Sequence, residues 1–369
     1  MGIDVIFDAK NWGMPLHFWS GVFFVLGCVV GSFLNVVIHR MPLEQSLVSP
    51  PSHCPHCNYS IPWYLNIPLG TWLYLRGKCA NCGAPISIRY FLVELLTGVT
   101  FTACWLMFNQ SPLLAVAYCL FLSGLIAATF IDFEHFIIPD EITMGGVVVG
   151  FLCSFLVPQL HGVSASTASL VRSLGGIAVG GGLIYFVLRL GKLLFGREKL
   201  ELPAGSKVIF TETAMVLPEE ERRYDELFYR KSDMIKLQAS TAELSDRCYR
   251  NVLVRLAPAT LKIDDEELNP EEVPYLAVMT DNLVLPREAM GLGDVKFMAA
   301  IGAFLGWQAV VFSLMASSVI GSIVGVTLIL LKKQSASSRL PYGPYIALAA
   351  AIWVFGGQGW WHWFWAIRH

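Results

Sequence analysis

Four of the nine cysteines form two pairs whose spacing suits a metal ion. Cys54 and Cys57 make one Cys-x-x-Cys pair, and Cys79 and Cys82 make a second pair after 21 intervening residues. Each pair can form a tight knuckle, and the two knuckles together can offer four thiolates to a tetrahedral zinc ion. The spacing predicts a structural zinc site, because four protein ligands leave no position open for catalysis. The alternatives are reduced, unligated thiols or a site that has lost its metal.

Two aspartates stand beside long apolar runs in contexts that suit catalysis. Asp132 closes one run, and Asp294 opens another, where it follows Gly291 and Gly293. A carboxylate inside a membrane helix costs roughly 2.5–3.5 kcal/mol on insertion scales, so it is seldom without a role. Two aspartates that share a site hold one proton between them and can activate water for peptide hydrolysis. Taken alone, an aspartate at a helix end is more often a helix cap or a solvated flank.

The composition indicates a membrane protein. Hydrophobic residues make up 55% of the 369 residues, charged residues only 15%, and the mean hydropathy is +0.56. Soluble domains carry roughly 25% charged residues. The net charge of −2 and the absence of a basic arm give no sign of a nucleic-acid partner, so the partner that we expect is the lipid bilayer.

Eight apolar runs approach the length of about 20 residues that crosses a bilayer. We expect an all-α polytopic membrane bundle with about eight transmembrane helices, carrying a cytoplasmic zinc-knuckle segment and a small β-rich cytoplasmic insert. The aromatic stretch 360–365 is typical of a membrane–water interface. The expected spans are 17–38, 90–108, 112–131, 142–160, 170–190, 294–306, 308–331 and 343–366.

The charges are concentrated in one segment. Residues 196–290 hold 13 Lys and Arg with 19 Asp and Glu, which is 32 of the 54 charges in the chain. We expect a water-soluble insert here, with a helix over 219–231. Gating of substrate, partner binding or mere decoration are all open as its role. Strands are predicted where β-branched and aromatic residues gather between polar breaks, over 207–217, 234–237, 248–256 and 275–285.

Basic residues in the loops set the expected orientation. With eight spans, three basic clusters fall on one side of the membrane, and this side should be the cytoplasm. The clusters are Arg40, Arg76, Lys78 and Arg89; Arg189, Lys192, Arg197 and Lys199; and Lys332, Lys333 and Arg339. The expected organisation is a first transmembrane helix with its motif (1–40), a cytoplasmic four-cysteine segment (41–90), helices two to five (91–195), the cytoplasmic insert (196–288) and helices six to eight (289–369).

Five motifs in a fixed order resemble the type IV prepilin peptidases, also called prepilin leader peptidase/N-methyltransferases. The likeness covers about residues 18–195 and 287–355. The motifs are Gly31–Arg40, the two cysteine pairs, Ser87–Thr97, Asp132–Asp140 and Gly291–Lys296.

The resemblance implies an aspartic protease of the bacterial inner membrane with its active site on the cytoplasmic side. It would cut the positively charged leader of type IV prepilins or pseudopilins after a glycine. By analogy, Asp132 and Asp294 are the catalytic aspartates, Gly291 and Gly293 support the second of them, and Asp140 is a cap or supporting residue.

The resemblance also implies a second reaction, in which S-adenosylmethionine methylates the newly exposed N-terminus. The candidates for this reaction are Gly31, Asn35, Arg40 and Glu94. Phe91 departs from the family, which commonly has proline after the Arg-Tyr pair, and the 196–288 insert is absent from compact members.

Two rival functions account for less of the sequence. A zinc intramembrane metalloprotease would need a His-Glu-x-x-His motif, and the eight histidines form none. A transporter or membrane scaffold with a structural zinc site would use the two aspartates as an ion pathway. Transporters often carry inverted repeats, whereas this sequence has no visible repeat.

Overall fold

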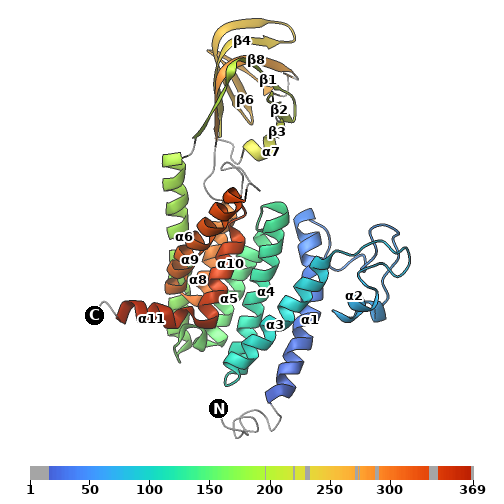
Figure 1. The fold of residues 1–369 in the computed structure, drawn as a ribbon. Coiled ribbons are helices and arrows are strands. Elements are labelled where there is room, and N and C mark those ends of the chain that lie inside the picture. Colours follow the sequence, from blue (N-terminus) through green and yellow to red (C-terminus); the bar gives the residue numbers. More distant parts are fainter. Residues whose placement is uncertain are drawn as a thin grey trace. The chain divides into compact units, whose positions relative to one another are not determined.

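The computed structural model describes residues 16–195, 197–218, 221–228, 233–270, 273, 275–286, 291–331 and 340–366. The basic cluster of Lys332, Lys333 and Arg339 lies outside these residues. The chain divides into two compact units, which are a helical unit of Met1–Tyr185 with Leu292–His369 and a sheet unit of Phe186–Gly291. Figure 1 shows the helices of the first unit and the strands of the second.

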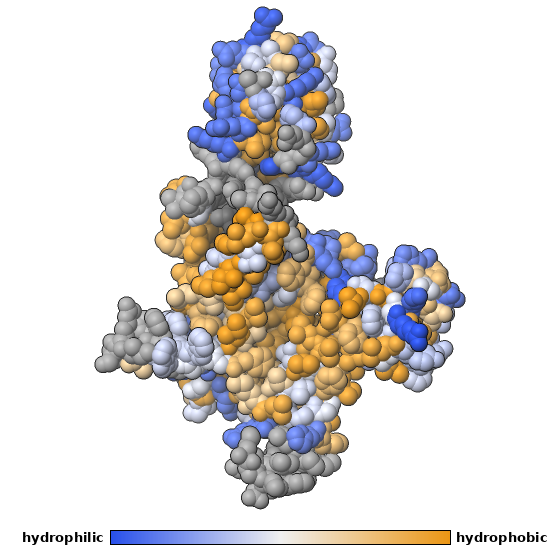
Figure 2. All heavy atoms as spheres, in the orientation of Figure 1, coloured by the Kyte–Doolittle hydropathy of each residue, from blue (hydrophilic) through white to orange (hydrophobic). Residues whose placement is uncertain are grey.

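The helical unit contains five described helices that are long and apolar enough to cross a membrane, which makes the chain a membrane protein. On the face shown in Figure 2, apolar residues cover most of this unit. The five are α1 (Leu16–Arg40), α3 (Ile88–Phe108), α4 (Pro112–His135), α6 (Ser166–Phe195) and α9 (Trp307–Leu330). The shorter helices are α2 (Gly70–Tyr74), α5 (Asp140–Leu156), α8 (Leu292–Leu305), α10 (Gly343–Ile352) and α11 (Gln358–Ala366).

Two of the expected spans differ from the structure. The fourth run ends early, because Val157 leaves the helical conformation before Pro158, and a short 3-10 turn follows over Pro158–His161. A residue before proline is held away from the helical region by the proline ring. The last run is broken by a π-turn at Trp353–Gly357, beyond which α11 crosses the direction of α10 (Figure 1). Gly356 allows the break, since its φ is 157°.

Helix α8 is the most enclosed helix of the bundle, and its residues from Phe297 to Leu305 are all buried. Glycines let its neighbours approach closely. A Cβ atom at Gly176 of α6 would lie 2.0 Å from the carbonyl oxygen of Gly302, and one at Gly180 would lie 2.3 Å from that of Met298. Small residues four apart are typical of helix contacts within membranes, because they bring the backbones together.

At the C-terminal end of α8, opposite Asp294, hydroxyl groups donate hydrogen bonds to a backbone carbonyl oxygen. Ser154 of α5 and Ser173 of α6 both donate to the carbonyl oxygen of Ala303, at 3.1 and 2.8 Å. The last carbonyls of a helix have no partner within the helix, so a buried helix end needs such donors. These bonds stabilise the buried C-terminal end of a helix of only 14 residues.

The sheet unit is one antiparallel sheet of eight strands in the order β3-β2-β1-β8-β4-β5-β6-β7. Its buried face holds one apolar cluster that includes Val208, Ile235, Val254 and Leu283. The strands are β1 (Arg197–Phe210), β2 (Ala214–Val216), β3 (Glu221–Arg223), β4 (Ile235–Leu244), β5 (Cys248–Ala257), β6 (Thr260–Ile263), β7 (Glu266–Leu268) and β8 (Leu276–Pro286).

The expected β-rich character of the insert is present, but the helix expected over 219–231 is wrong in its described part. Residues Glu221–Arg223 form β3, which pairs with β2, and α7 is a single turn over Tyr224–Leu227. Pairing of Glu221 with Val216 holds the start of the segment in the sheet. Phe228 ends this turn in an extended conformation, and positions 219–220 and 229–231 of the expected helix lie outside the described residues.

The contact between α6 and α8 gives a stability prediction. Gly176→Ala should destabilise the protein by about 1–3 kcal/mol, because the added methyl group meets a backbone oxygen that has little room to move. The measurement is the apparent thermal unfolding temperature of the purified protein in detergent. Gly175→Ala is the matched control, since nothing lies within 4 Å of its Cβ position. Equal unfolding temperatures for the two variants would contradict the packing described here.

Candidate functional site

Asp132 lies at the C-terminal end of α4 and is 5% exposed. The helix ends at His135, and Phe136 follows it with a left-handed φ of 55° that turns the chain. The N–H of Phe136 donates to the Asp132 carbonyl oxygen at 3.0 Å. The side chain is held from another helix, since the N–H of Gly343 donates to Asp132 Oδ2 at 2.9 Å. A Cβ at position 343 would lie 2.7 Å from that oxygen, so only glycine permits this approach.

Asp294 lies in the first turn of α8 and is 9% exposed. Gly293, just before it, packs against Ile138, because a Cβ built there would lie 3.5 Å from the Cβ and the carbonyl oxygen of Ile138. Ile138 also lies beside Gly343, at 3.0 Å from the corresponding Cβ position. Both aspartates are therefore at the same end of the helical unit, around the Ile138 segment. Gly291 lies just before α8 and is exposed.

An ion pair joins α8 to α5, the helix that follows Ile138 in the chain. Lys296 Nζ of α8 lies 2.6 and 2.8 Å from the carboxylate oxygens of Asp140. Asp140 is the first residue of α5 rather than its cap, which is Pro139. Asp140 therefore does not occupy the cap position, and its supporting role stays a prediction. A second pair, Arg89 with Glu134, joins the start of α3 to the end of α4.

The four paired cysteines come together in one cluster. Their sulfur atoms lie within 4.8 Å of one another, with 3.8 Å between Cys54 and Cys82 and 4.0 Å between Cys57 and Cys79. Zinc–sulfur bonds of about 2.3 Å in a tetrahedron place the sulfurs about 3.8 Å apart. The cluster thus has the geometry of a four-thiolate zinc site.

Two similar backbone turns build this cluster. The N–H groups of Asn58 and Gly83 donate to the carbonyl oxygens of Cys54 and Cys79, at 2.9 and 3.0 Å. Asn58 and Gly83 both have positive φ, 55° and 72°. The backbone N–H groups of Cys82 and Asn81 lower the pKa of Cys79 to about 6. In the same cluster, desolvation and the hydrogen bonds with the other three thiols raise the pKa of Cys82 to about 11, so the four thiols do not share one state of ionisation.

A cavity of about 840 Å³ lies between the cysteine segment and the helices α1 and α3. Three of the residues expected to serve methylation line it, namely Asn35, Arg40 and Glu94. Gly31 does not line it. A Cβ at Gly31 would lie 2.7 Å from the Cα of Glu94, so this glycine serves the close contact of α1 with α3.

The polar groups of the cavity are buried and mostly fixed. Glu94 is 8% exposed and accepts a hydrogen bond from the Leu69 N–H at 2.7 Å. Asn35 donates to the Tyr90 carbonyl oxygen at 3.0 Å, while its own buried Oδ1 has no partner among the described residues. Arg40 donates to the carbonyl oxygens of Ser46 and Pro50 and so orders the loop after α1.

Sequence reasoning did not find Gly343 or the cavity. Gly343 lies between Tyr342 and Pro344 at the start of the last apolar run, and only this proline-flanked position could have marked it. Trp72, which lines the cavity, lies in the short helix α2 that no sequence pattern predicted, and its ring contacts Phe91 with 5.2 Å between centroids. Phe91, the departure from the family, is thus part of the packing beside the cavity.

The fold describes a membrane protein with a buried aspartate at the end of α4, a second one in the first turn of α8, and a four-cysteine cluster. Two family models match it. Residues 25–108 match the bacterial peptidase A24 N-terminal domain, and residues 119–207 with 272–326 match the type IV leader peptidase family. The unmatched gap lies within the sheet unit.

Several curated proteins are similar over different shares of the chain. The prepilin leader peptidase/N-methyltransferase of Aeromonas hydrophila is 28% identical over 95% of both chains. The protein of that name from Myxococcus xanthus is 52% identical over 36% of this chain and 39% of its own length. The type 4 prepilin-like proteins leader peptide-processing enzyme of Escherichia coli is 35% identical over 50% of this chain and 71% of its own length. No solved structure matches.

The chain therefore belongs to the type IV leader peptidase family and is an enzyme of that peptidase family. The resemblance stated from the sequence is confirmed. These matches favour the peptidase over the transporter or scaffold alternative.

The cysteine cluster gives a prediction about metal content. Cys79→Ser should reduce bound zinc from about one equivalent to nearly none, because three thiolates and a hydroxyl bind zinc far more weakly. Atomic spectroscopy on the purified protein measures this. Cys248→Ser, at an exposed cysteine on β5, should leave the zinc content unchanged. Equal zinc in the two variants would contradict the assignment.

Proposed function

We propose that this enzyme is a membrane aspartic endopeptidase that removes the leader of type IV prepilins or pseudopilins, cutting after a glycine. The main support for the proposal is that Asp132 and Asp294 lie at the same end of the helical unit. Gly293, next to Asp294, packs against Ile138, which follows the end of α4. Family membership supplies the substrate class, since the similar curated proteins are named for prepilin processing.

The two aspartates would act through activated water. One carboxylate takes a proton from the water as it attacks the scissile carbonyl, and the other, protonated, polarises that carbonyl. The Gly343 N–H fixes the orientation of the Asp132 carboxyl group, so that group is held in place before substrate arrives. Lys296 and Asp140 would hold α8 against α5 and so position Asp294 indirectly.

The proposed setting is the cytoplasmic face of the bacterial inner membrane, reached by eight spans. The basic loop residues support this side, because positive charge accumulates in cytoplasmic loops. The helices α5 and α8 and the pair α10–α11 would complete the eight spans with the five longer helices. In this arrangement the aspartates, the cysteine segment and the sheet unit all face the cytoplasm.

A second activity, N-methylation of the cleaved product, is favoured by the cavity beside the cysteine segment. Its volume of about 840 Å³ is large enough for a cofactor of the size of S-adenosylmethionine. The unpartnered Oδ1 of Asn35 and the carboxylate of Glu94 offer acceptors to an amine or to the ribose and adenine groups. When bound, S-adenosylmethionine supplies the methyl group. The structural zinc ion would hold the two knuckles that form one wall of the cavity.

The first prediction tests the aspartate pair. Asp132→Asn and Asp294→Asn should each lower the cleavage rate by at least about 100-fold, because neither carboxylate can complete the proton exchange alone. Cleavage of a synthetic prepilin segment by the purified variants measures this. Glu141→Gln, at an exposed carboxylate in the first turn of α5, is the matched control and should retain cleavage. Full cleavage by either Asp variant would exclude the pair.

The second prediction separates methylation from cleavage. Glu94→Gln should abolish methylation and spare cleavage, because the amide oxygen can still accept from Leu69 while the charge is lost. Conversely, Asp132→Asn should still methylate a peptide that already begins with free phenylalanine. Mass spectrometry after addition of S-adenosylmethionine follows both products. A wild-type enzyme that cleaves but never methylates would show that the second activity is absent, and Phe91 is then the first residue to replace.

A further inference from the structure

Four basic residues line up across the strands of the sheet unit. Lys236 of β4 pairs with Arg255 of β5, which pairs in turn with Lys262 of β6. On the other side, Lys236 and Lys199 of β1 both pair with Val284 of β8. Residues paired across antiparallel strands project to the same face of the sheet. We call Lys199, Lys236, Arg255 and Lys262 the basic row. These residues occupy one face of the sheet, and Val284 is the single neutral residue among them.

This face is the solvent side of the sheet. The neighbours of the row along each strand belong to the buried apolar cluster, for example Leu237, Val254 and Leu261. Lys199 and Arg255 are exposed, and Lys236 and Lys262 are half-buried. Like charges directly opposite one another in a sheet are destabilising, so an uncompensated row of this kind calls for an external anion.

The protein neutralises only the far end of the row. Lys262 Nζ lies 2.9 Å from Glu267. Among the described residues, Lys199, Lys236 and Arg255 form no ion pair.

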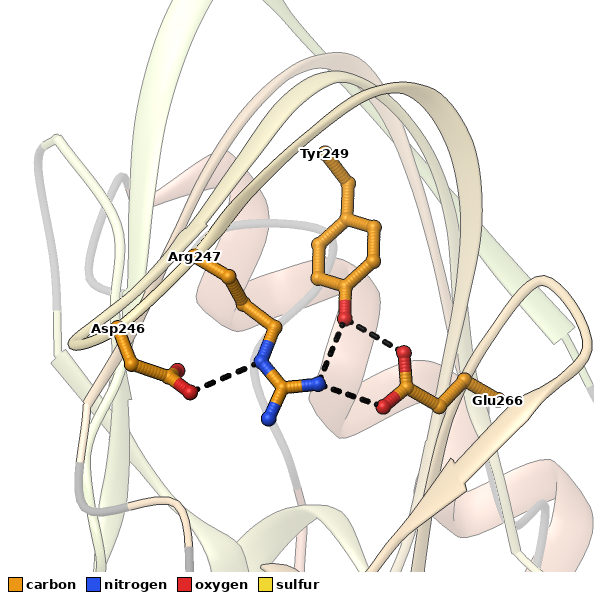
Figure 3. A network of polar contacts seen from close by, with 4 residues as sticks. All are labelled: Asp246, Arg247, Tyr249 and Glu266. Carbon is orange, nitrogen blue, oxygen red and sulfur yellow. Dashed lines mark hydrogen bonds and ion pairs between the residues drawn. The ribbon is translucent and has the colours of Figure 1, made fainter.

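By contrast, another arginine of the sheet unit is paired with carboxylates. Arg247, at the turn between β4 and β5, contacts both Asp246 and Glu266, at 3.0 and 2.7 Å, and Tyr249 donates to Glu266 (Figure 3). The charge of Arg247 is thus neutralised within the unit. Lys236 and Arg255 lie at the opposite end of the hairpin, in the second residue of β4 and near the end of β5.

The end of the sheet that carries the row is the end at which the chain connects to membrane helices. Arg197 pairs with Pro286, so β1 begins and β8 ends side by side. Lys199 follows the last residue of α6 by four positions, which is at most about 14 Å of extended chain. Arg189 and Lys192 add two more basic residues in the last turns of α6. Lys199, at one end of the basic row, is therefore tethered by a short stretch of chain to a helix that is long and apolar enough to cross a membrane.

We propose that the basic row binds the headgroups of anionic phospholipids. Clusters of four or more Lys and Arg immediately next to a transmembrane helix attract anionic lipid surfaces, and this attraction acts within about one Debye length, 8–10 Å at moderate salt. A flat row of cations on a sheet suits a plane of phosphate groups. The leader of a prepilin is itself positively charged, so the row would repel that substrate rather than bind it.

Acetylation of lysines in the full-length protein tests this contact. The protein is placed in nanodiscs of phosphatidylcholine alone or with one part in three of phosphatidylglycerol, and mass spectrometry measures how fast each lysine reacts. Lys199, Lys236 and Lys262 should react at least about fivefold more slowly with the anionic lipid, and high salt should remove the difference. Lys207, exposed near the other end of the paired part of β1, is the internal control and should be unaffected.

A double variant connects the effect to the row. In Lys236→Gln/Arg255→Gln the slower reaction of Lys199 with anionic lipid should be lost, whereas Lys207→Gln should keep it. Thermal unfolding checks that both variants are folded. If Lys199 in the unmodified protein reacts as fast with the anionic lipid as with phosphatidylcholine alone, the proposal is overturned. Protection by inorganic phosphate in phosphatidylcholine nanodiscs would point instead to a soluble anion and would overturn the lipid assignment.

Discussion

The close approach of α5 and α6 to α8 is the contact on which the rest of the helical unit depends. Each of the two outer helices presents a pair of glycines four residues apart, Gly146 with Gly150 and Gly176 with Gly180. At Gly150, Gly176 and Gly180, an added Cβ would lie under 3.0 Å from atoms of α8. Because a lipid environment gives no hydrophobic drive for helix association, such backbone packing supplies the attraction. Helix α8 is thereby held at the centre of its group, with Asp294 in its first turn.

The position of Asp132 follows from a similar constraint. Its helix, α4, packs against α10, whose first residue is Gly343. The hydrogen bond from Gly343 fixes a carboxyl group that is almost fully buried, and an unpartnered polar group there would be costly. Around Ile138, glycine contacts thus bring together three segments that are far apart in the chain. The same absence of side chains that permits tight helix packing also permits close approach of a backbone N–H to a carboxylate.

The cysteine segment and the sheet unit are the two polar parts of the chain, and each is held together by its own internal contacts. The cysteine segment forms two matching knuckles that bring four sulfur atoms together. The sheet unit has its own apolar cluster and begins and ends on the paired strands β1 and β8. Since its two ends are neighbours, the unit can be accommodated between α6 and α8 without separating those helices. This arrangement explains how the family match resumes after the gap.

The sequence by itself determined the membrane class, the approximate places of the helices, the paired cysteines and the family. These features are local, because apolar run length, Cys-x-x-Cys spacing and motif order can be read along the chain. It predicted Asp132 and Asp294 as a pair but not what surrounds them. Only the tertiary structure decided that Gly343 contacts Asp132, that Asn35 and Glu94 share a cavity, and that basic residues of four strands form one row. Contacts of this kind depend on strand register and helix packing, which join residues tens to hundreds of positions apart and leave no periodic signal in the sequence.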